Sequence, residues 1–425
     1  MGASNENTKA WLEDELIPKL KSCLKRTDSS MSYKVSTPQD SFFLSRVFFL
    51  DLKFAENEKR EFNSEYNLVV KQPTALKTLN ELLKVEVPFT KEILFYRKFA
   101  QNSSDYPRCF YTLDKAPYDS LVILENLTKD GYQICSKKAN LQMEFVLAAV
   151  QEIARFHAKS YILKNKQPKE FFNFIEEINK LNSRILASKD SCIMIGANAI
   201  GARIVNYLRR ENYDKEFCDK IEPILVNACD QIVNNIKRSE EPLTVLCHGD
   251  FLRNNIVFKK IDDQIKAKVI DFGAIEYNSP GTDLSKFLIL NCTREVRTSK
   301  LNFVIDAYHK ALCDCLEEAD VSNLERFSKP KFLEEYKTTA LCVFACNSFF
   351  IPRTFDFVSD SVETLINLTG EESYRFYYEV GGDEMTKIFV GILQDLRESG
   401  CLDFFLIKNI GKEESGKVAQ QESAK

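Results

Sequence analysis

The apolar positions of the chain follow two different periods, and the change between them separates a mixed first part from a mainly helical remainder. Apolar side chains three and four positions apart over residues 8–24 predict an amphipathic helix, which Pro18 divides. Short aromatic and β-branched runs predict strands at residues 42–50, 66–71 and 120–124, with a helix at residues 89–99 before the last of them. The first part is therefore expected to contain a small sheet.

Beyond residue 141 the apolar stripe has the helical period, so a larger, mainly helical part is expected. Helices are predicted at residues 141–163, 170–188, 200–210, 214–237, 299–318, 331–349 and 384–399. Three short apolar segments interrupt this pattern, at residues 244–247, 255–258 and 266–270. The end of the chain, residues 411–425, is polar and is predicted to be disordered.

Composition narrows the class of protein. The 425 residues include 58 Lys and Arg and 62 Asp and Glu, a balance without the basic surplus of a dedicated nucleic-acid binder, so no nucleic-acid partner is expected. No apolar run reaches the roughly 18 residues that span a bilayer, and the N-terminus has no signal pattern. The 13 cysteines contain no CxxC pair, which favours reduced thiols in a reducing compartment. We therefore expect a soluble, cytoplasmic protein.

The residues with catalytic potential lie around the three short apolar segments. The segment from His248 to Asn255 reads H-G-D-F-L-R-N-N, and Asp271 opens a D-F-G triplet at the end of an apolar run. Phosphoryl transfer from ATP needs a carboxylate that orients the attacking hydroxyl, and hard oxygen ligands that hold Mg²⁺. Asp250 suits the first role, and Asn255 and Asp271 suit the second. Each is also an ordinary turn residue, but their order and spacing together predict a kinase.

The remaining roles of an ATP site have candidates upstream. Lys71 ends a predicted strand and would bind the ATP phosphates, and Glu92 in the following helix would orient it. Either residue alone is commonplace in its position, so the interpretation depends on their order and separation. At the end of strand 120–124, the backbone of Glu125 and Leu127 is predicted to bind adenine, although a plain strand-to-loop junction has the same pattern.

The acceptor is expected to be a small molecule with a hydroxyl group. Only twelve positions separate Asp271 from Asp283, too few for a regulated loop that receives a peptide. Residues 343–357 contain five phenylalanines, and an apolar pocket suits a steroid-like compound better than a polycationic sugar. Choline, which needs an aromatic cage and a nearby acid, stays open. The same aromatic residues would equally suit helix packing in the core.

Taken together, these segments resemble the ecdysteroid kinase-like family, which is related to the choline and aminoglycoside kinases. The resemblance spans roughly residues 36–400 and is carried by the two catalytic segments and by residues 124–127, 153–160 and 280–284. It implies a bilobal α+β fold of the protein-kinase type, with a small sheet-containing N-lobe over residues 1–127 and a larger, mainly helical C-lobe over residues 128–410. It also implies ATP and Mg²⁺ as cofactors and the hydroxyl group of an ecdysteroid as the acceptor.

The resemblance adds one residue and raises two alternatives. Ser45 matches a small hydroxyl residue of the family's phosphate-covering loop, which implies a phosphate contact. That loop, residues 40–45, contains no glycine, so its backbone has less freedom to approach phosphates. One alternative is therefore a catalytically impaired kinase fold that binds a hydrophobic ligand or a partner. The other is a choline- or ethanolamine-type kinase. The oligomeric state is not predicted.

Overall fold

The structure is a computed structural model of the chain. It describes residues 9–27, 30–38, 45–55, 62–74, 84–101, 103–181, 189–234, 239–358, 364–365 and 367–407. Backbone contacts divide the chain into two compact units. The first unit is Met1–Gln133 with Ile270–Ala274, and the second unit is Ile134–Val269 with Ile275–Lys425. The predicted disordered tail, residues 411–425, lies outside the described residues.

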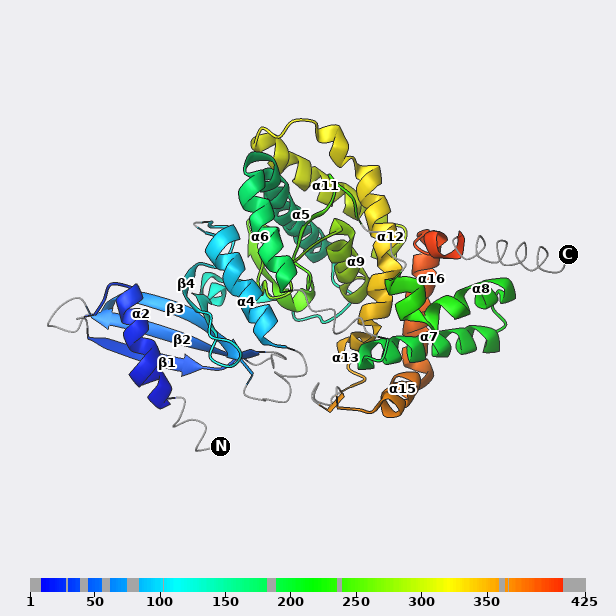
Figure 1. The fold of residues 1–425 in the computed structure, drawn as a ribbon, viewed down its shortest axis with the longest axis horizontal. Coiled ribbons are helices and arrows are strands. Elements are labelled where there is room, and N and C mark those ends of the chain that lie inside the picture. Colours follow the sequence, from blue (N-terminus) through cyan, green and yellow to red (C-terminus); the bar gives the residue numbers. More distant parts are fainter. Residues whose placement is uncertain are drawn as a thin grey trace. The chain divides into compact units, whose positions relative to one another are not determined.

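The first unit is built on a five-stranded antiparallel sheet with the strand order β1-β2-β3-β5-β4 (Figure 1). The strands are β1 Met31–Ser36, β2 Ser45–Ala55, β3 Phe62–Pro73, β4 Cys109–Leu113 and β5 Leu121–Glu125. Lys71 of β3 pairs with Val47 of β2 and with Val122 of β5. It therefore occupies a central strand of the sheet, with a neighbouring strand on each side.

The N-terminal helical segment packs on this sheet and provides much of its core. It consists of the π-helical η1 Leu12–Leu16 and the α-helix α2 Ile17–Cys23. Pro18 is the second residue of α2, but the backbone stays helical from η1 through Leu16 and Ile17, so the structure changes helix type before this proline and does not divide the segment there. The buried core combines the helical Leu12, Leu16, Ile17 and Leu20 with the sheet residues Phe48, Leu50, Leu52, Phe54, Leu68, Val70, Leu121 and Ile123.

A second helical segment of the first unit follows β3. It runs as α4 Glu86–Leu94 and continues as the π-helical η2 Phe95–Phe99. After β5, Asn126 caps the short helix η3 Leu127–Asp130 by accepting a hydrogen bond from the N–H group of Thr128. The unit thus has the predicted strands and helix in the predicted order.

Two strands of this sheet, β1 and β4, were not predicted. They are the two edge strands, and most of β1 is exposed while every residue of β4 is only half-buried. An edge strand such as β1 can be exposed and so lack the apolar runs from which β2, β3 and β5 were recognised, whereas β4 has a short aromatic run that was not recognised.

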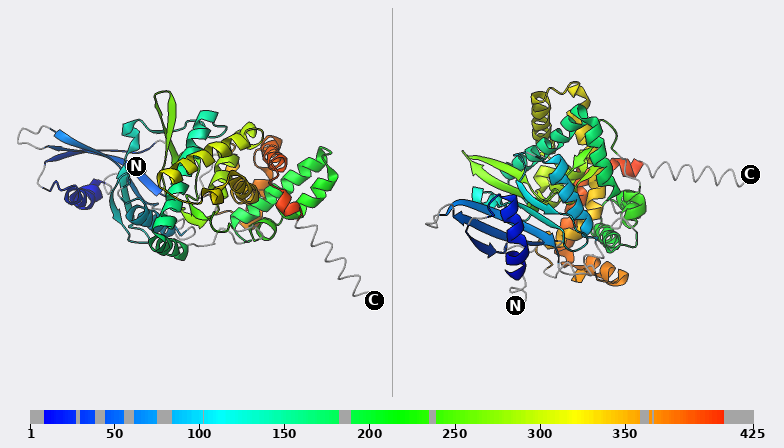
Figure 2. Two further views of the ribbon diagram at one scale, coloured as in Figure 1. Left: turned by 90° about the horizontal axis from the view of Figure 1, so that it is seen from above. Right: turned by 60° about the vertical axis from the view of Figure 1, so that its left-hand side comes forward.

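The second unit is mainly helical. Its longer helices are α5 Met143–Lys166, α6 Pro168–Lys180, α7 Cys192–Arg210, α8 Lys215–Leu225, α9 Pro280–Asn291, α11 Leu301–Glu318, α12 Lys329–Asn347, α15 Gly370–Glu379 and α16 Gly382–Glu398. Short helical turns are η5 Cys229–Val233, η6 Arg253–Asn255, α10 Arg294–Arg297, η7 Leu324–Phe327, η8 Ser348–Phe350 and α13 Ile351–Thr354. Within this unit α5 packs against α11 and α9 against α12 (Figures 1 and 2).

Short strands interrupt these helices. Where the sequence predicted strands, the structure has β7 Val245–Cys247, β8 Ile256–Ile261 and β9 Gln264–Val269. The two shorter strands β6 Gln133–Ile134 and β10 Glu276–Asn278 were not predicted. β8 and β9 form an antiparallel pair, as do β7 and β10. The helix α9 was not predicted, and the physical reason is its burial: ten of its twelve residues are buried, so it presents no polar face and no helical period.

Two further observations concern the whole of the described chain. All 13 cysteines lie within it, and none of them forms a disulfide bond there. No helix among the described residues is both long enough and apolar enough to cross a membrane.

Candidate active site

In the first unit, Lys71 is held between two carboxylates. Its Nζ lies 2.7 Å from Glu92 Oε2 on α4 and 2.7 Å from Asp271 Oδ1. The side chains of Lys71 and Glu92 are almost buried, at 11% and 1% exposure, whereas Asp271 is 39% exposed. The structure therefore brings together three predicted site residues that are far apart in the sequence, with one open side at Asp271.

The electrostatics of this cluster keep the lysine charged. Burial lowers the pKa of Lys71, but the charges and hydrogen bonds of Asp271 and Glu92 outweigh burial, and the net shift is upward. Burial also raises the pKa of Glu92, which the Lys71 ammonium opposes. A buried ammonium that is fixed by a neighbouring carboxylate suits the binding of phosphate oxygens.

The backbone at Asp271 is strained, and its neighbour Phe272 holds it in place. Asp271 has φ +67°, a left-handed conformation that is uncommon for residues other than glycine, although aspartate adopts it more readily than most. Phe272 is fully buried and stacks on Phe95 of η2, with ring centroids 3.7 Å apart and an interplanar angle of 14°. Tyr106 adds an edge contact at 5.3 Å. Strain of this kind is found preferentially at functional sites, where the surrounding packing maintains it.

In the second unit, Asp250 and Asn255 lie on the segment that joins β7 to β8. Asn255 Nδ2 donates a hydrogen bond to the Asp250 carbonyl oxygen at 2.8 Å and another to its carboxylate Oδ2 at 2.9 Å. Asn255 Oδ1 accepts a hydrogen bond from Asn254 Nδ2 at 3.1 Å. Asn255 is buried, whereas the Asp250 side chain is 41% exposed. The carboxylate of Asp250 is therefore oriented through one oxygen and remains accessible to solvent.

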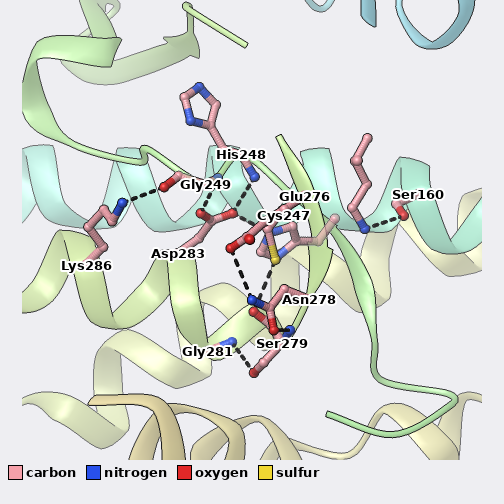
Figure 3. Close-up of polar contacts among 12 residues, drawn as sticks. Ser160, Cys247, His248, Gly249, Glu276, Asn278, Ser279, Gly281, Asp283 and Lys286 are labelled. Carbon is pink, nitrogen blue, oxygen red and sulfur yellow. Dashed lines mark hydrogen bonds and ion pairs between the residues drawn. The ribbon is translucent and has the colours of Figure 1, made fainter. Parts of the chain in front are cut away.

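The segment around Asp250 is anchored by Asp283, in the first turn of α9 (Figure 3). Asp283 Oδ2 accepts the N–H of His248 at 2.7 Å, and Oδ1 accepts the N–H of Gly249 at 2.9 Å. Gly249 has φ +78°, a conformation that favours glycine. The buried ring of His248 accepts the N–H of Asp250 through Nδ1 at 3.3 Å. The backbone N–H groups of the candidate base Asp250 and of the two residues before it are thus all hydrogen-bonded to side chains.

Asp283 is completely buried and has a further partner in His157 of α5. Its Oδ2 lies 3.1 Å from His157 Nε2, and His157 Nδ1 lies 2.7 Å from the Tyr308 hydroxyl. Because a carboxylate only accepts, Nε2 is the donor, and in the neutral ring Nδ1 accepts from Tyr308. Burial raises the pKa of Asp283. The hydrogen bonds from His157 and from the His248 backbone, with the charges of both histidines, outweigh burial, so the net shift of this pKa is downward. Asp283 therefore anchors the segment as a carboxylate.

The predicted adenine contacts and Ser45 occupy separate parts of the first unit. Glu125 ends β5: its N–H donates to the Arg108 carbonyl at 2.8 Å, and its Oε2 accepts the Arg108 N–H at 3.2 Å. Leu127 begins η3 and is buried. Ser45 is the half-buried first residue of β2, and the adjoining residues 39–44 lie outside the described part of the chain. The adenine and phosphate contacts of these three residues stay predictions.

Sequence reasoning assigned no site role to Asp283 or Lys286, which both lie on α9. Asp283 entered the prediction only through its distance from Asp271 and as one of the residues 280–284 that carry the family resemblance, and Lys286 did not enter it. The available signal for Asp283 was its place at a helix start, directly after the serine and proline of residues 279–280. No local pattern reveals that α9 packs beside the catalytic segment, so the role of Lys286 needed the structure.

These features define a small-molecule kinase with a kinase-like α+β fold, in which one unit contains the sheet and the other is mainly helical. The ecdysteroid kinase-like family matches the chain over residues 39–321, which is more than half of its length. The chain therefore belongs to the ecdysteroid kinase-like family, and it is an ATP-dependent phosphotransferase that acts on a hydroxyl group. No curated protein sequence matches the chain.

Several solved kinase structures resemble the chain along most of its length. A Plasmodium vivax ethanolamine kinase has 12% identity and a TM-score of 0.39, covering 87% of this chain and 86% of its own. The GDP complex of aminoglycoside 2'-phosphotransferase-IIIa has 12% identity and a TM-score of 0.43, with coverages of 86% and 98%. A microcompartment-associated aminopropanol kinase has 10% identity and a TM-score of 0.37, with coverages of 91% and 99%. Because these similarities are distant, the assignment depends on the family match.

Proposed function

We propose that the chain transfers the γ-phosphoryl group of ATP, in the presence of Mg²⁺, to a hydroxyl group of an ecdysteroid or of another apolar hydroxylated compound. The observation that carries this proposal is the orientation and exposure of the Asp250 carboxylate. Its carboxylate is oriented by Asn255 through Oδ2, lies on a segment anchored by Asp283, and is partly exposed. A general base for an alcohol acceptor needs this combination of fixed orientation and access.

The residues present fit magnesium-ATP. Mg²⁺ prefers hard oxygen ligands, and the Asp271 carboxylate and the Asn255 carboxamide oxygen are ligands of this kind. The charged, nearly buried ammonium of Lys71 suits phosphate oxygens, because it is fixed by Glu92. When bound, magnesium-ATP supplies the phosphoryl group and the metal charge that neutralises it.

In the proposed reaction each residue of the chain has one task. Asp250 Oδ1 accepts the hydrogen bond of the acceptor's hydroxyl group, orients it and takes its proton. Asn255 prevents rotation of that carboxylate by holding Oδ2 and also offers Oδ1 to the metal. Lys71, oriented by Glu92, binds the phosphate oxygens, and Asp271 is the carboxylate ligand of the metal. Asp283 keeps the backbone of the catalytic segment in place.

The preference for an apolar acceptor is supported by the residues at the end of α12 and just after it. Four of the five phenylalanines in residues 343–357 are only half-buried: Phe349, Phe350, Phe355 and Phe357. The rings of Phe349 and Phe350 lie 4.0 Å apart. Half-buried aromatic side chains of the second unit offer apolar contact area of the kind that lines ligand sites. A binder without turnover remains the alternative, because residues 40–45 contain no glycine.

A direct transfer assay tests the proposed function. The purified chain is incubated with radiolabelled magnesium-ATP and ecdysone, and phosphorylated ecdysone is measured for wild type and for Asp250→Asn. Loss of the general base is expected to lower the rate by about 10² to 10⁴. Asp263→Asn, an exposed aspartate in the β8–β9 turn, is the matched control and is expected to retain full activity. Transfer at the wild-type rate by Asp250→Asn contradicts the role of Asp250, and nucleotide binding without transfer to ecdysone or any other apolar alcohol favours the binder.

A further inference from the structure

A lysine lies directly beside the proposed base. Lys286, on α9, donates a hydrogen bond from Nζ to the carbonyl oxygen of Gly249, as Figure 3 shows. The same Nζ lies 3.6 Å from Asp250 Oδ1, and the Lys286 side chain is only 14% exposed. The ammonium group is therefore held at the catalytic segment by a backbone contact, and it is shielded from most of the solvent.

The two oxygens of the Asp250 carboxylate differ in their surroundings. Oδ2 accepts the hydrogen bond of Asn255, whereas Oδ1 faces the ammonium of Lys286 at a distance longer than a hydrogen bond. Oδ1 is therefore the oxygen that an acceptor's hydroxyl group would use. An ammonium has three N–H donors, and the Gly249 carbonyl takes one of them. An alcohol bound to Oδ1 would place its first carbon atoms within a few ångströms of this cation.

The charge of Lys286 also reaches the neighbouring helix α12. The pKa of Cys346 is lowered first by its hydrogen bond with Cys342 and additionally by the Lys286 ammonium, while burial opposes both. Glu276 of β10 is a carboxylate that acts on the same helix, at Cys342, and its Oε1 accepts a hydrogen bond from Asn278. Cys346 lies three positions before Phe349, the first of the half-buried phenylalanines, so the charge of Lys286 reaches the start of the region that the proposed function assigns to the acceptor.

The balance of charge at Asp250 follows from these contacts. A kinase that takes an amino alcohol needs uncompensated negative charge near the acceptor's ammonium group. Here the charge of the base is compensated by Lys286, and a second ammonium in the acceptor would lie near the first. Repulsion between partly buried charges is weakly screened by salt. A neutral alcohol meets no such repulsion, and an anionic one is attracted.

We propose that Lys286 is a specificity-determining residue that restricts the acceptor to neutral or anionic alcohols and excludes amino alcohols such as choline and ethanolamine. This inference rests on the proposed phosphotransferase function and deepens it by naming the charge class of the substrate. It also separates that function from the choline-type alternative, which differs from it only in the acceptor.

A pair of probes with the same shape tests the inference. Choline and its neutral carbon analogue dimethylbutanol differ in one atom, the quaternary centre, so that the ratio of their kcat/KM values reports the effect of charge. Wild type is expected to favour the neutral alcohol by at least about tenfold, which corresponds to about 1.4 kcal/mol. Lys286→Met keeps the length of the side chain and is expected to bring the ratio close to one, and Lys286→Glu is expected to invert it.

Two control variants keep the result specific. Lys286→Arg retains the positive charge and is expected to retain the preference for the neutral alcohol. Lys310→Met removes an exposed lysine of α11 that is paired with Asp314, and it is expected to leave the ratio unchanged. Melting temperatures of all variants show whether each is folded. Equal use of both probes by wild type, a preference for choline, or an unchanged ratio in Lys286→Met overturns the inference.

A binding experiment separates failure of this inference from failure of the proposed function. Binding of magnesium-ATP is measured first by thermal shift. If nucleotide binds and neither probe nor ecdysone is phosphorylated, the proposed function fails, and the same two probes are titrated into the full chain with magnesium-ADP. Tighter binding of dimethylbutanol that is lost in Lys286→Met still supports a charge filter at this site. Equal binding, tighter binding of choline, or no binding of either probe overturns it.

Discussion

Asn255 holds Asp250 by two hydrogen bonds from one nitrogen atom, to the backbone carbonyl at 2.8 Å and to the carboxylate Oδ2 at 2.9 Å. The sequence suggested only a metal-ligand role for this asparagine. The structure gives it a second contact, with the proposed base itself. A substitution at Asn255 should therefore affect the orientation of the base as well as nucleotide binding.

Asn255→Ala is expected to lower kcat by about 10²-fold, because a misplaced carboxylate no longer aligns the acceptor's hydroxyl group. The measurement is steady-state kinetics with ATP as the varied substrate. Asn254→Ala is the matched control: it changes an exposed neighbour whose described side-chain bond is to Asn255 Oδ1, and a much smaller loss is expected. A higher KM for ATP with an unchanged kcat in Asn255→Ala would show that the asparagine does not orient the base.

Lys71→Met is expected to destabilise the chain by about 3 to 5 kcal/mol, because it leaves the Glu92 carboxylate buried without its cation. Glu92→Gln in the same chain removes the uncompensated charge and should recover part of the loss. The free energies of unfolding of both single variants and of the double variant, measured in urea, form the required cycle. If the two single effects simply add, the pair is not coupled, and the proposed orientation of Lys71 by Glu92 is wrong.

Asp283→Asn is expected to destabilise the chain at neutral pH by about 2 to 5 kcal/mol, and the loss should depend on pH. Although burial raises the pKa of Asp283, its hydrogen bond with His157 and other contacts lower it below the ordinary value. The carboxylate therefore contributes stability above an unfolded-state pKa of about 3.9, and this contribution disappears as the pH falls through the lowered value. The free energies of unfolding of wild type and Asp283→Asn are measured between neutral and acidic pH, and the difference between them should become smaller as the pH falls. A difference that stays constant would contradict the assignment of Asp283 as a stabilising carboxylate.

The sequence predicted those site residues that lie close together along the chain or on successive elements. Asp250 and Asn255 lie five positions apart on one loop, and their order and spacing, together with those of His248 and Asp271, indicated a shared site. Lys71 and Glu92 were recognised from the order of strand and helix, and the structure joins them directly. Such features are local, or they follow from the succession of elements along the chain.

The residues that were missed depend on contacts between distant elements. Asp283 and Lys286 act on the catalytic segment because α9 packs beside it, and α9 has no helical period because most of its residues are buried. The pattern of apolar residues records that a segment is buried, but not which segment it packs against. The edge strand β1 was missed for the opposite reason, since it is too exposed to show an apolar run, whereas the aromatic run of β4 was present in the sequence and was not recognised.

The central claim, that Asp271 takes part in binding magnesium-ATP, is tested most directly by thermal unfolding of wild type and Asp271→Asn with and without magnesium and ATP. A ligand at a hundredfold its dissociation constant stabilises a protein by about 2.7 kcal/mol, which raises the melting temperature by several degrees. We predict a magnesium-dependent rise for wild type and for the control Asp263→Asn, and its loss in Asp271→Asn. An absent rise in wild type at millimolar magnesium-ATP, or an equal rise in Asp271→Asn, would contradict the account.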